Sequence, residues 1–208
     1  MIDNETLDTM LWKKVSRIKQ ELNFTQIKAI ADLFAHIVDY KSPFTSNHSI
    51  GVAEGAEKIS RFMGFDEDIC QKMYLAGALH DIGKVAIGNE ILEKPEKLTD
   101  EEFKTMKHHA VYTYYILSGI DDFEEIRDWA ALHHEKLNGK GYPFGKTADE
   151  LNEQERIMAC IDIYQALTEN RPYKKGLSHE KACDILDDMA QKGFVDSDIS
   201  NKIRECFK

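Results

Sequence analysis

Apolar residues recur at helical spacing along nearly all of this 208-residue chain. Ile27, Ile30, Phe34 and Val38 follow one another at intervals of three or four residues, which places them on one face of a helix. Only 4 prolines and 12 glycines interrupt such stripes, and the alternating pattern of half-buried strands is scarce. The sequence therefore predicts an all-α fold.

Capping residues and glycines indicate where the helices begin and end. Thr99, with Glu102 three residues later, forms a capping box, and Gly119 ends the helix that it opens. We expect helices at about residues 7–22, 27–38, 46–63, 66–79, 99–119, 122–135, 152–167, 178–193 and 197–207. The first of these has apolar spacing close to that of a short coiled coil. It predicts either a homodimer through the N-terminal helices or ordinary core contacts.

The charge of the chain argues against nucleic acid polymers as partners. The formal net charge is −10, which repels a polyphosphate backbone. Two segments depart from this balance. Residues 136–146 contain three lysines, and residues 171–178 contain Arg171, Lys174 and Lys175, with no acid in either segment. Local positive charge on an acidic protein indicates a small anionic ligand, unless these segments are simply solvated loops.

Cysteine usage and the absence of targeting signals indicate a cytoplasmic protein. The 4 cysteines are far apart and form no C-x-x-C pair, so we interpret them as reduced and mostly buried thiols. The first residues are acidic and lack the basic-then-apolar plan of a signal peptide. No apolar run approaches the ~18 residues that a membrane span needs. We therefore expect no membrane contact.

Histidines and aspartates occur together in patterns that suit metal ligands. His80-Asp81 places a carboxylate directly after an imidazole, so that the carboxylate can bridge two ions while the imidazole binds one of them. His133-His134 places two imidazoles side by side. The complete set lacks thiolates, which suits a metal-assisted phosphate-ester hydrolase better than a structural zinc site. Its members are His48, His80, Asp81, His109, His133, His134 and Asp162.

The same residues belong to a longer pattern. The pattern consists of His48, His80-Asp81-Ile82-Gly83-Lys84, Lys94-Pro95, His109, His133-His134-Glu135, Gly139-x-Gly141-Tyr142-Pro143, Asp162 and Arg171-Pro172-Tyr173. It resembles the HD-GYP domain, a branch of the HD metal-dependent phosphohydrolases. The resemblance begins at about residue 41 and runs to the C-terminus. We therefore predict an HD-GYP domain at residues 41–208, preceded by an N-terminal helical extension at residues 1–40.

The resemblance implies a helical bundle around a binuclear metal site. It implies hydrolysis of the bacterial messenger cyclic di-GMP to linear pGpG, with GMP as the product of a second cut. Two divalent cations, iron or manganese, are implied as cofactors, with Asp81 bridging them. By matched position, the first ion has the ligands His48, His80, Asp81 and Asp162, and the second has Asp81, His109, His133 and His134.

The resemblance also assigns roles around the metals. Lys84 matches the lysine that faces the scissile phosphate, so Lys84 and Asp81 are the predicted catalytic residues. The substrate contacts are predicted by position too. Gly141 and Tyr142 match the loop that contacts the nucleotide, and Arg171 and Lys174 match phosphate contacts.

Several positions depart from the pattern of the family. Phe44 stands four residues before His48, where members with three metals carry a glutamate, so we predict two metals. Asn138, Ala110 and Gln165 replace residues that are usual in the family, which leaves the substrate preference open. One alternative is therefore a phosphohydrolase of another cyclic dinucleotide or nucleotide. The other is a metal-bound receptor or adaptor that binds a cyclic dinucleotide without hydrolysing it.

Overall fold

The computed structural model describes residues 21–41, 47–170 and 175–208. Most of the helix predicted at residues 7–22 lies outside these ranges, as does the homodimer contact predicted through it. Phe44, Arg171 and Lys174 also lie outside the described residues. Every regular element within the described ranges is helical, which confirms the all-α prediction.

The helices agree closely with the sequence pattern. The bounds are α2 Phe24–Lys41, α3 His48–Phe62, α4 Glu67–Leu79, η1 Ile82–Ala86, α5 Asn89–Leu92, α6 Asp100–Leu117, α7 Glu124–Ala131, η2 Ala148–Glu150, α8 Glu153–Thr168, α9 His179–Gln191 and α10 Ser197–Cys206. The capping box of Thr99 and Glu102 opens α6 as predicted. The helix predicted at residues 122–135 is wrong at its C-terminal end, because α7 ends at Ala131.

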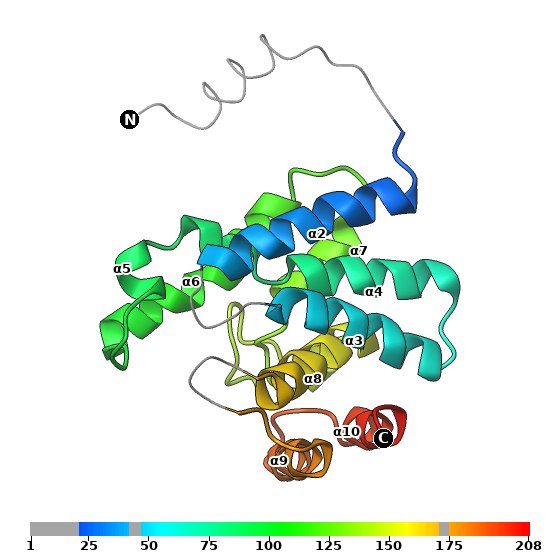
Figure 1. Ribbon diagram of the computed structural model, residues 1–208. Coiled ribbons are helices and arrows are strands. Elements are labelled where there is room, and N and C mark those ends of the chain that lie inside the picture. Colours follow the sequence, from blue (N-terminus) through cyan, green and yellow to red (C-terminus); the bar gives the residue numbers. More distant parts are fainter. Residues whose placement is uncertain (1–20, 42–46, 171–174) are drawn as a thin grey trace, which may run out of the picture.

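The helices α3 and α4 lie side by side as a hairpin in the middle of the molecule (Figure 1). Gly77 of α4 permits their close approach, since a Cβ atom there would lie 2.6 Å from the Cα atom of Ala53 in α3. Helix α2 packs on α4, α6 packs on η1 and α7, and α8 packs on α3. Helices α9 and α10 pair with each other below α8 (Figure 1). In the described part of the chain, no helix is both long and apolar enough to span a membrane.

Helix α2 is part of the same hydrophobic core. Its residues Ala31 and Ala35 are buried in one cluster with Val52 and Ile59 of α3 and Met73 of α4. The domain boundary at residues 40/41 stays a prediction. What the packing does establish is that α2 supports the helix on which the first predicted metal ligand lies.

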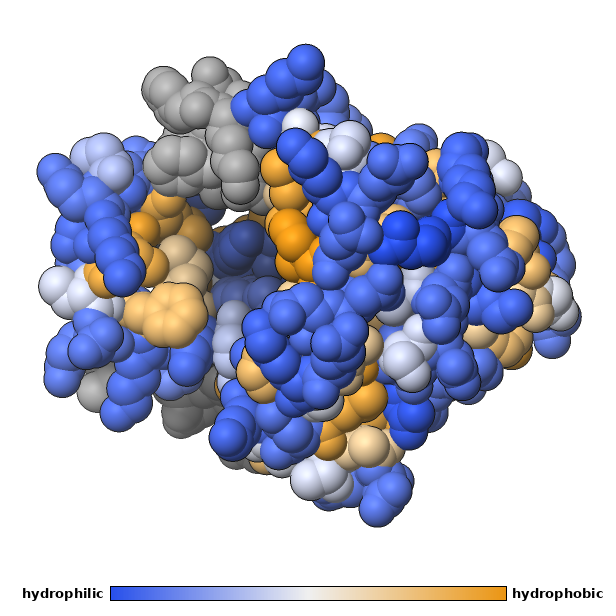
Figure 2. Space-filling view, turned by 90° about the horizontal axis from the view of Figure 1, so that it is seen from below, coloured by the Kyte–Doolittle hydropathy of each residue, from blue (hydrophilic) through white to orange (hydrophobic). Residues whose placement is uncertain are grey.

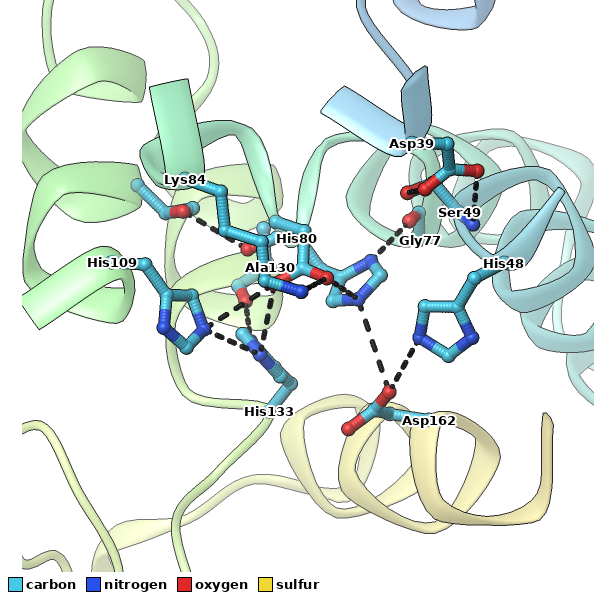
Figure 3. Close-up of polar contacts among 12 residues, drawn as sticks. Asp39, His48, Ser49, Gly77, His80, Lys84, His109, Ala130, His133 and Asp162 are labelled. Carbon is cyan, nitrogen blue, oxygen red and sulfur yellow. Dashed lines mark hydrogen bonds and ion pairs between the residues drawn. The ribbon is translucent and has the colours of Figure 1, made fainter. Parts of the chain in front are cut away.

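A carboxylate on α2 fixes the beginning of α3. Asp39 is 3% exposed and accepts hydrogen bonds from the backbone N (3.0 Å) and the Oγ (2.8 Å) of Ser49, next to His48. Its negative charge also lies at the N-terminus of α3, where the helix dipole favours an anion. Figure 3 shows this pair beside the predicted metal ligands.

We expect Asp39→Asn to lower the free energy of unfolding by about 1–2 kcal/mol, because the amide cannot accept from both Ser49 donors and carries no charge. Denaturant unfolding of the metal-free protein measures this. Asp188→Asn is the matched control, since Asp188 is exposed and pairs only with Lys192 on the surface of α9. Its replacement should cost less than about 0.5 kcal/mol. Equal losses in the two variants would contradict the role of Asp39.

Candidate metal centre

The seven predicted metal ligands converge in the middle of the bundle, although they come from distant parts of the sequence. Figure 3 shows His48, His80, His109, His133 and Asp162 around this centre. They lie in the first turn of α3, just beyond the C-terminal ends of α4 and α7, and within α6 and α8. Six are buried and one is partly buried. The residues are His48, His80, Asp81, His109, His133, His134 and Asp162.

One cluster of ligand atoms lies between α3, α4 and α8. The Nε2 atom of His48 is 3.0 Å from Oδ1 of Asp162, and Nε2 of His80 is 3.8 Å from the same oxygen. These three side chains present ligand atoms that all lie within 4.8 Å of one another. Among the described residues, the buried Nδ1 atom of His48 has no hydrogen-bond partner, and Oε2 of Glu169 is 3.7 Å away from it. This arrangement can hold one cation.

A second cluster lies between α6 and the turn after α7. It consists of His109, His133 and His134, whose ligand atoms also lie within 4.8 Å of one another. The Nε2 atoms of His109 and His133 are 3.5 Å apart. Three imidazoles in this arrangement suit a divalent cation of intermediate softness. Neutral imidazoles can bind one cation together because they carry no charges that repel one another.

Asp81 lies between the two clusters. Its Oδ2 atom is 3.1 Å from Nε2 of His80, on the first cluster. Its Oδ1 atom is 3.3 Å from Nε2 of His109 and 4.0 Å from Nε2 of His133, on the second. Oδ1 is buried and finds no hydrogen-bond partner in the part of the chain that the structure describes, which is costly unless something else satisfies it. The residues therefore fit a pair of cations with Asp81 placed between them.

Backbone carbonyls orient three of the imidazoles. In each case the Nδ1 atom lies close to the carbonyl oxygen three residues earlier. A carbonyl only accepts, so Nδ1 carries the proton, and the Nε2 lone pair is left to point into the centre. The pairs are His80 with Gly77 (2.7 Å), His109 with Met106 (2.7 Å) and His133 with Ala130 (2.6 Å).

Burial keeps most of the imidazoles neutral. It lowers the pKa of His109, lowers that of His133 well below its ordinary value, and lowers that of His134 to about 3. His80 behaves differently. Burial would lower its pKa, but the neighbouring carboxylate of Asp81 raises it to about 9. A divalent cation bound between these two groups would take the place of that proton, as happens when metals bind histidine.

The two aspartates are held in their charged form. Burial alone would raise their pKa values. Lys84 and His80 nevertheless keep the pKa of Asp81 well below its ordinary value, and His48 does the same for Asp162. The centre thus combines carboxylates that are ionised with imidazoles that are mostly neutral, which is the protonation state that metal binding requires.

Both His133 and His134 face the centre, although neighbouring side chains on a helix point about 100° apart. They follow the last residue of α7 and lie in a turn, closed by a hydrogen bond from the backbone N of Glu135 to the carbonyl oxygen of Leu132 (2.8 Å). Outside the helix the angle between neighbouring side chains is not fixed, and the rings of His133 and His134 lie 4.0 Å apart.

Lys84 lies at the same place. Its Nζ atom is 2.5 Å from Oδ2 of Asp81, and its side chain is 19% exposed. The short helix η1 carries it against α6, because Gly83 has no side chain. A Cβ atom there would lie 1.9 Å from the carbonyl oxygen of His109 and 2.6 Å from the backbone N of Thr113. Gly83 is thus needed for the close contact between η1 and α6.

The Gly-Tyr-Pro loop returns to the centre. The ring of Tyr142 lies 4.7 Å from that of His134 and 6.3 Å from that of His109. Gly141 passes so close to the preceding turn that a Cβ atom would lie 2.4 Å from the backbone N of Lys136. Burial raises the pKa of the Tyr142 hydroxyl, so it stays protonated at neutral pH.

Glu135 anchors this loop, a role that the sequence analysis missed. The Glu135 carboxylate is 3% exposed and accepts hydrogen bonds from three successive backbone N–H groups. The donors are Phe144 (2.6 Å), Gly145 (3.0 Å) and Lys146 (3.0 Å). A glutamate directly after two ligands and before a glycine-rich loop is the only signal that the sequence offers.

We expect Glu135→Gln to loosen the loop, because the amide group turns a donor toward one of the three N–H groups. The lost hydrogen bonds should cost about 1–3 kcal/mol locally. Amide hydrogen exchange at residues 144–146 should then be about tenfold faster or more. Glu150→Gln is the control, since Glu150 caps η2 at the surface of the same loop. Unchanged exchange at residues 144–146 in Glu135→Gln would show that the carboxylate does not hold the loop.

A cavity of about 390 Å³ opens over the centre. Figure 2 shows the molecule hollowed on this face, with apolar surface along the rim. All the ligand side chains except His80 line the cavity, together with Lys84 and Tyr142. A group of aliphatic side chains and Lys94 form the side toward α5 and α6. The cavity can therefore receive a ligand with both anionic and apolar parts.

A helical bundle with a buried cluster of imidazoles and carboxylates defines a class of metal-binding domain, and comparison with known proteins identifies it. The profile of the HD domain family matches residues 32–199. The chain belongs to this family, in its HD-GYP branch.

Several characterised proteins are similar in sequence. The 3'3'-cGAMP-specific phosphodiesterase 1 of Vibrio cholerae is 36% identical over 185 residues, which are 89% of this chain and 43% of that protein. A cyclic di-GMP phosphodiesterase of Pseudomonas aeruginosa is 36% identical over 140 residues, 67% of this chain and 34% of that protein. The chain thus spans less than half the length of these relatives.

Solved structures share the fold. An HDG"Y"P protein from Bdellovibrio bacteriovorus superposes with a TM-score of 0.64 at 14% identity, covering 89% of this chain and 64% of that one. The HD domain of the phosphodiesterase PgpH from L. monocytogenes, in complex with cyclic-di-AMP, superposes with a TM-score of 0.62 at 18% identity, covering 84% and 92%.

Proposed function

We propose that this chain is a metal-dependent phosphodiesterase that hydrolyses cyclic di-GMP to linear pGpG and then, by a second cut, to GMP. The observation that carries the proposal is the position of Asp81, whose two oxygens face two separate clusters of ligand atoms. Sites for two metal ions are typical of enzymes that cleave phosphate esters. Similarity to phosphodiesterases of cyclic dinucleotides supports the same reaction.

The seven ligands would hold two divalent cations, iron or manganese, because nitrogen and oxygen donors suit both ions. Such cations supply Lewis acidity, which lowers the pKa of water and withdraws charge from a phosphoryl oxygen. Asp81 would belong to both ions. His48, His80 and Asp162 would complete the ligands of the first, and His109, His133 and His134 those of the second.

Lys84 is the proposed catalytic partner of the metals. Its ammonium group lies at the bottom of the cavity, 2.5 Å from Oδ2 of Asp81. From there it can donate a hydrogen bond to a non-bridging phosphate oxygen and stabilise the charge that develops in the transition state. It can also give its proton to the leaving 3′ oxygen.

The proposed substrate contacts come from the Gly-Tyr-Pro loop and from the basic segment at residues 171–178. The ring of Tyr142 can stack on a guanine base, and Gly141 lets the backbone come close to the nucleotide. Arg171 and Lys174 are proposed to bind the second phosphate on the strength of the sequence pattern, the arginine bidentately.

A second candidate substrate is 3'3'-cGAMP. Two relatives from Vibrio cholerae at 36% and 38% identity are named as phosphodiesterases specific for it. The third candidate is a receptor that binds a cyclic dinucleotide without hydrolysis. All seven ligands stand together in this structure, which favours an enzyme over such a receptor.

The proposal is tested on protein purified anaerobically, with its metal content measured and both cyclic dinucleotides supplied as substrates. We expect about two metal ions per chain and a linear dinucleotide as the first product. Hydrolysis of 3'3'-cGAMP alone would move the substrate assignment to the second candidate. Tight binding without turnover by the metal-loaded protein would establish the receptor instead.

A cytoplasmic location is part of the proposal. The 4 cysteines have free thiols and 3 of them are buried, as expected of a protein from a reducing compartment. The homodimer through residues 7–22 stays a prediction, which sedimentation of the full chain at several concentrations tests.

A further inference from the structure

Four aliphatic side chains form one wall of the cavity over the metal centre. Ile91 and Leu92 belong to α5, Leu98 to the segment between α5 and α6, and Met106 to α6. We call this group the apolar wall. None of the four belongs to the hydrophobic core cluster of the bundle. Ile91, Leu98 and Met106 are only partly buried, so the wall keeps apolar surface available to a ligand.

The apolar wall is fixed relative to the metal ligands. The carbonyl oxygen of Met106 lies 2.7 Å from Nδ1 of His109, so the wall and a ligand share one turn of α6. The segment that carries Leu98 is held by Lys94, whose Nζ lies 2.6 and 2.7 Å from the two carboxylate oxygens of Glu102. A phosphate bound at the centre would therefore have this wall at its side.

A phosphodiester group is charged and gains nothing from contact with an aliphatic surface. The purine bases of a nucleotide can pack on such a surface, because their flat faces are apolar while their edges are polar. We propose that the apolar wall binds the face of one purine base of a cyclic dinucleotide whose phosphate lies at the metal centre. This inference rests on the proposed function, and it adds a binding site for the base to the predicted contacts of Tyr142 and the basic segment.

The side chains of the wall carry no hydrogen-bond donor and no acceptor stronger than the thioether of Met106, which has a consequence for specificity. An aliphatic contact with a base face does not distinguish guanine from adenine, because the two differ at their edges. The wall should therefore accept cyclic di-GMP and 3'3'-cGAMP equally. Selection between these substrates then has to come from other parts of the cavity.

Leu98→Ala and Met106→Ala test the wall, with Leu98→Met as the matched variant that keeps an aliphatic surface. Two ligands are compared on metal-loaded protein: cyclic di-GMP as the substrate, and inorganic phosphate as a competitive inhibitor that can occupy the metal centre but has no ring. The KM for cyclic di-GMP should rise about tenfold in each alanine variant, as expected for lost apolar contact in a binding pocket. The inhibition constant of inorganic phosphate should stay at its wild-type value in both alanine variants, and Leu98→Met should keep the wild-type KM because its side chain remains apolar.

Calorimetric titration with cyclic di-GMP separates failure of this inference from failure of the proposed function. If the wild type binds the dinucleotide without hydrolysing it, and the alanine variants bind it about tenfold more weakly, the wall is supported and the phosphodiesterase activity is refuted. If the alanine variants keep the wild-type KM and Kd, or lose affinity for inorganic phosphate as much as for cyclic di-GMP, the wall does not bind the base. A wild-type protein that neither binds nor hydrolyses the dinucleotide overturns both proposals.

Discussion

Asp81→Ala is expected to lose bound metal and to lower kcat for cyclic di-GMP by at least about a thousandfold. The reason is that Asp81 has one oxygen close to each cluster, at 3.1 Å from His80 and 3.3 Å from His109, whereas Asp162 approaches the second cluster only to 3.8 Å, at Nδ1 of His134. Removing it takes a ligand from both ions at once. Elemental analysis of purified protein and a turnover assay measure the two effects.

Two controls distinguish the loss of a metal ligand from misfolding and from the loss of any carboxylate. Circular dichroism should show wild-type helicity in Asp81→Ala, because the core cluster does not include this residue. Asp184→Ala, which removes an exposed carboxylate on α9, should keep both metal and activity. A folded Asp81→Ala variant that hydrolyses cyclic di-GMP at the wild-type rate would refute the two-metal proposal.

Replacing Lys84 should have the next largest effect. We expect Lys84→Met to lower kcat by about 10²–10³-fold, since a positive charge aimed at the transition state is lost. The metal content should stay the same, because lysine is not among the ligands and methionine retains the length of the side chain. Steady-state kinetics together with elemental analysis distinguish this result from that of Asp81→Ala.

The control for Lys84 is Lys192→Met, which removes an exposed ammonium group that pairs with Asp188 on α9. It should leave kcat unchanged. If Lys84→Met lost its metal as Asp81→Ala does, Lys84 would act by holding the Asp81 carboxylate in place. Catalysis at the wild-type rate with full metal content would remove Lys84 from the mechanism.

That the candidate metal ligands would lie together could be predicted from the HD-GYP pattern to which they belong. His80 and Asp81 directly follow an apolar stripe that ends at Leu79, and the structure ends α4 there. The turn after α7 could not be predicted in the same way. It contains no glycine or proline to indicate a helix end, and the backbone hydrogen bond from Glu135 to Leu132 that closes it can be seen only in the folded structure. The helix predicted from the apolar pattern was therefore too long at its C-terminal end.

Short elements and backbone contacts also escaped the sequence analysis. The helices η1 and α5 span only five and four residues, which is too few to show a helical period. Glu135 accepts hydrogen bonds from backbone N–H groups. Nearly every residue has such a group, so the sequence does not indicate which ones Glu135 contacts. The apolar wall could not be foreseen either, because its side chains come from separate segments that meet only in the folded protein.

Because the ligands are far apart in the sequence, the availability of the metal ion should affect the stability of the folded protein. His48 and Asp162 are 114 residues apart in the chain and 3.0 Å apart in the structure. A cation held by both would act as a cross-link that closes a very long loop, and such closure disfavours the unfolded chain strongly. The loaded protein should therefore melt at a higher temperature and resist proteases longer than the metal-free form. A cell short of the ion would then lose the polypeptide as well as its activity.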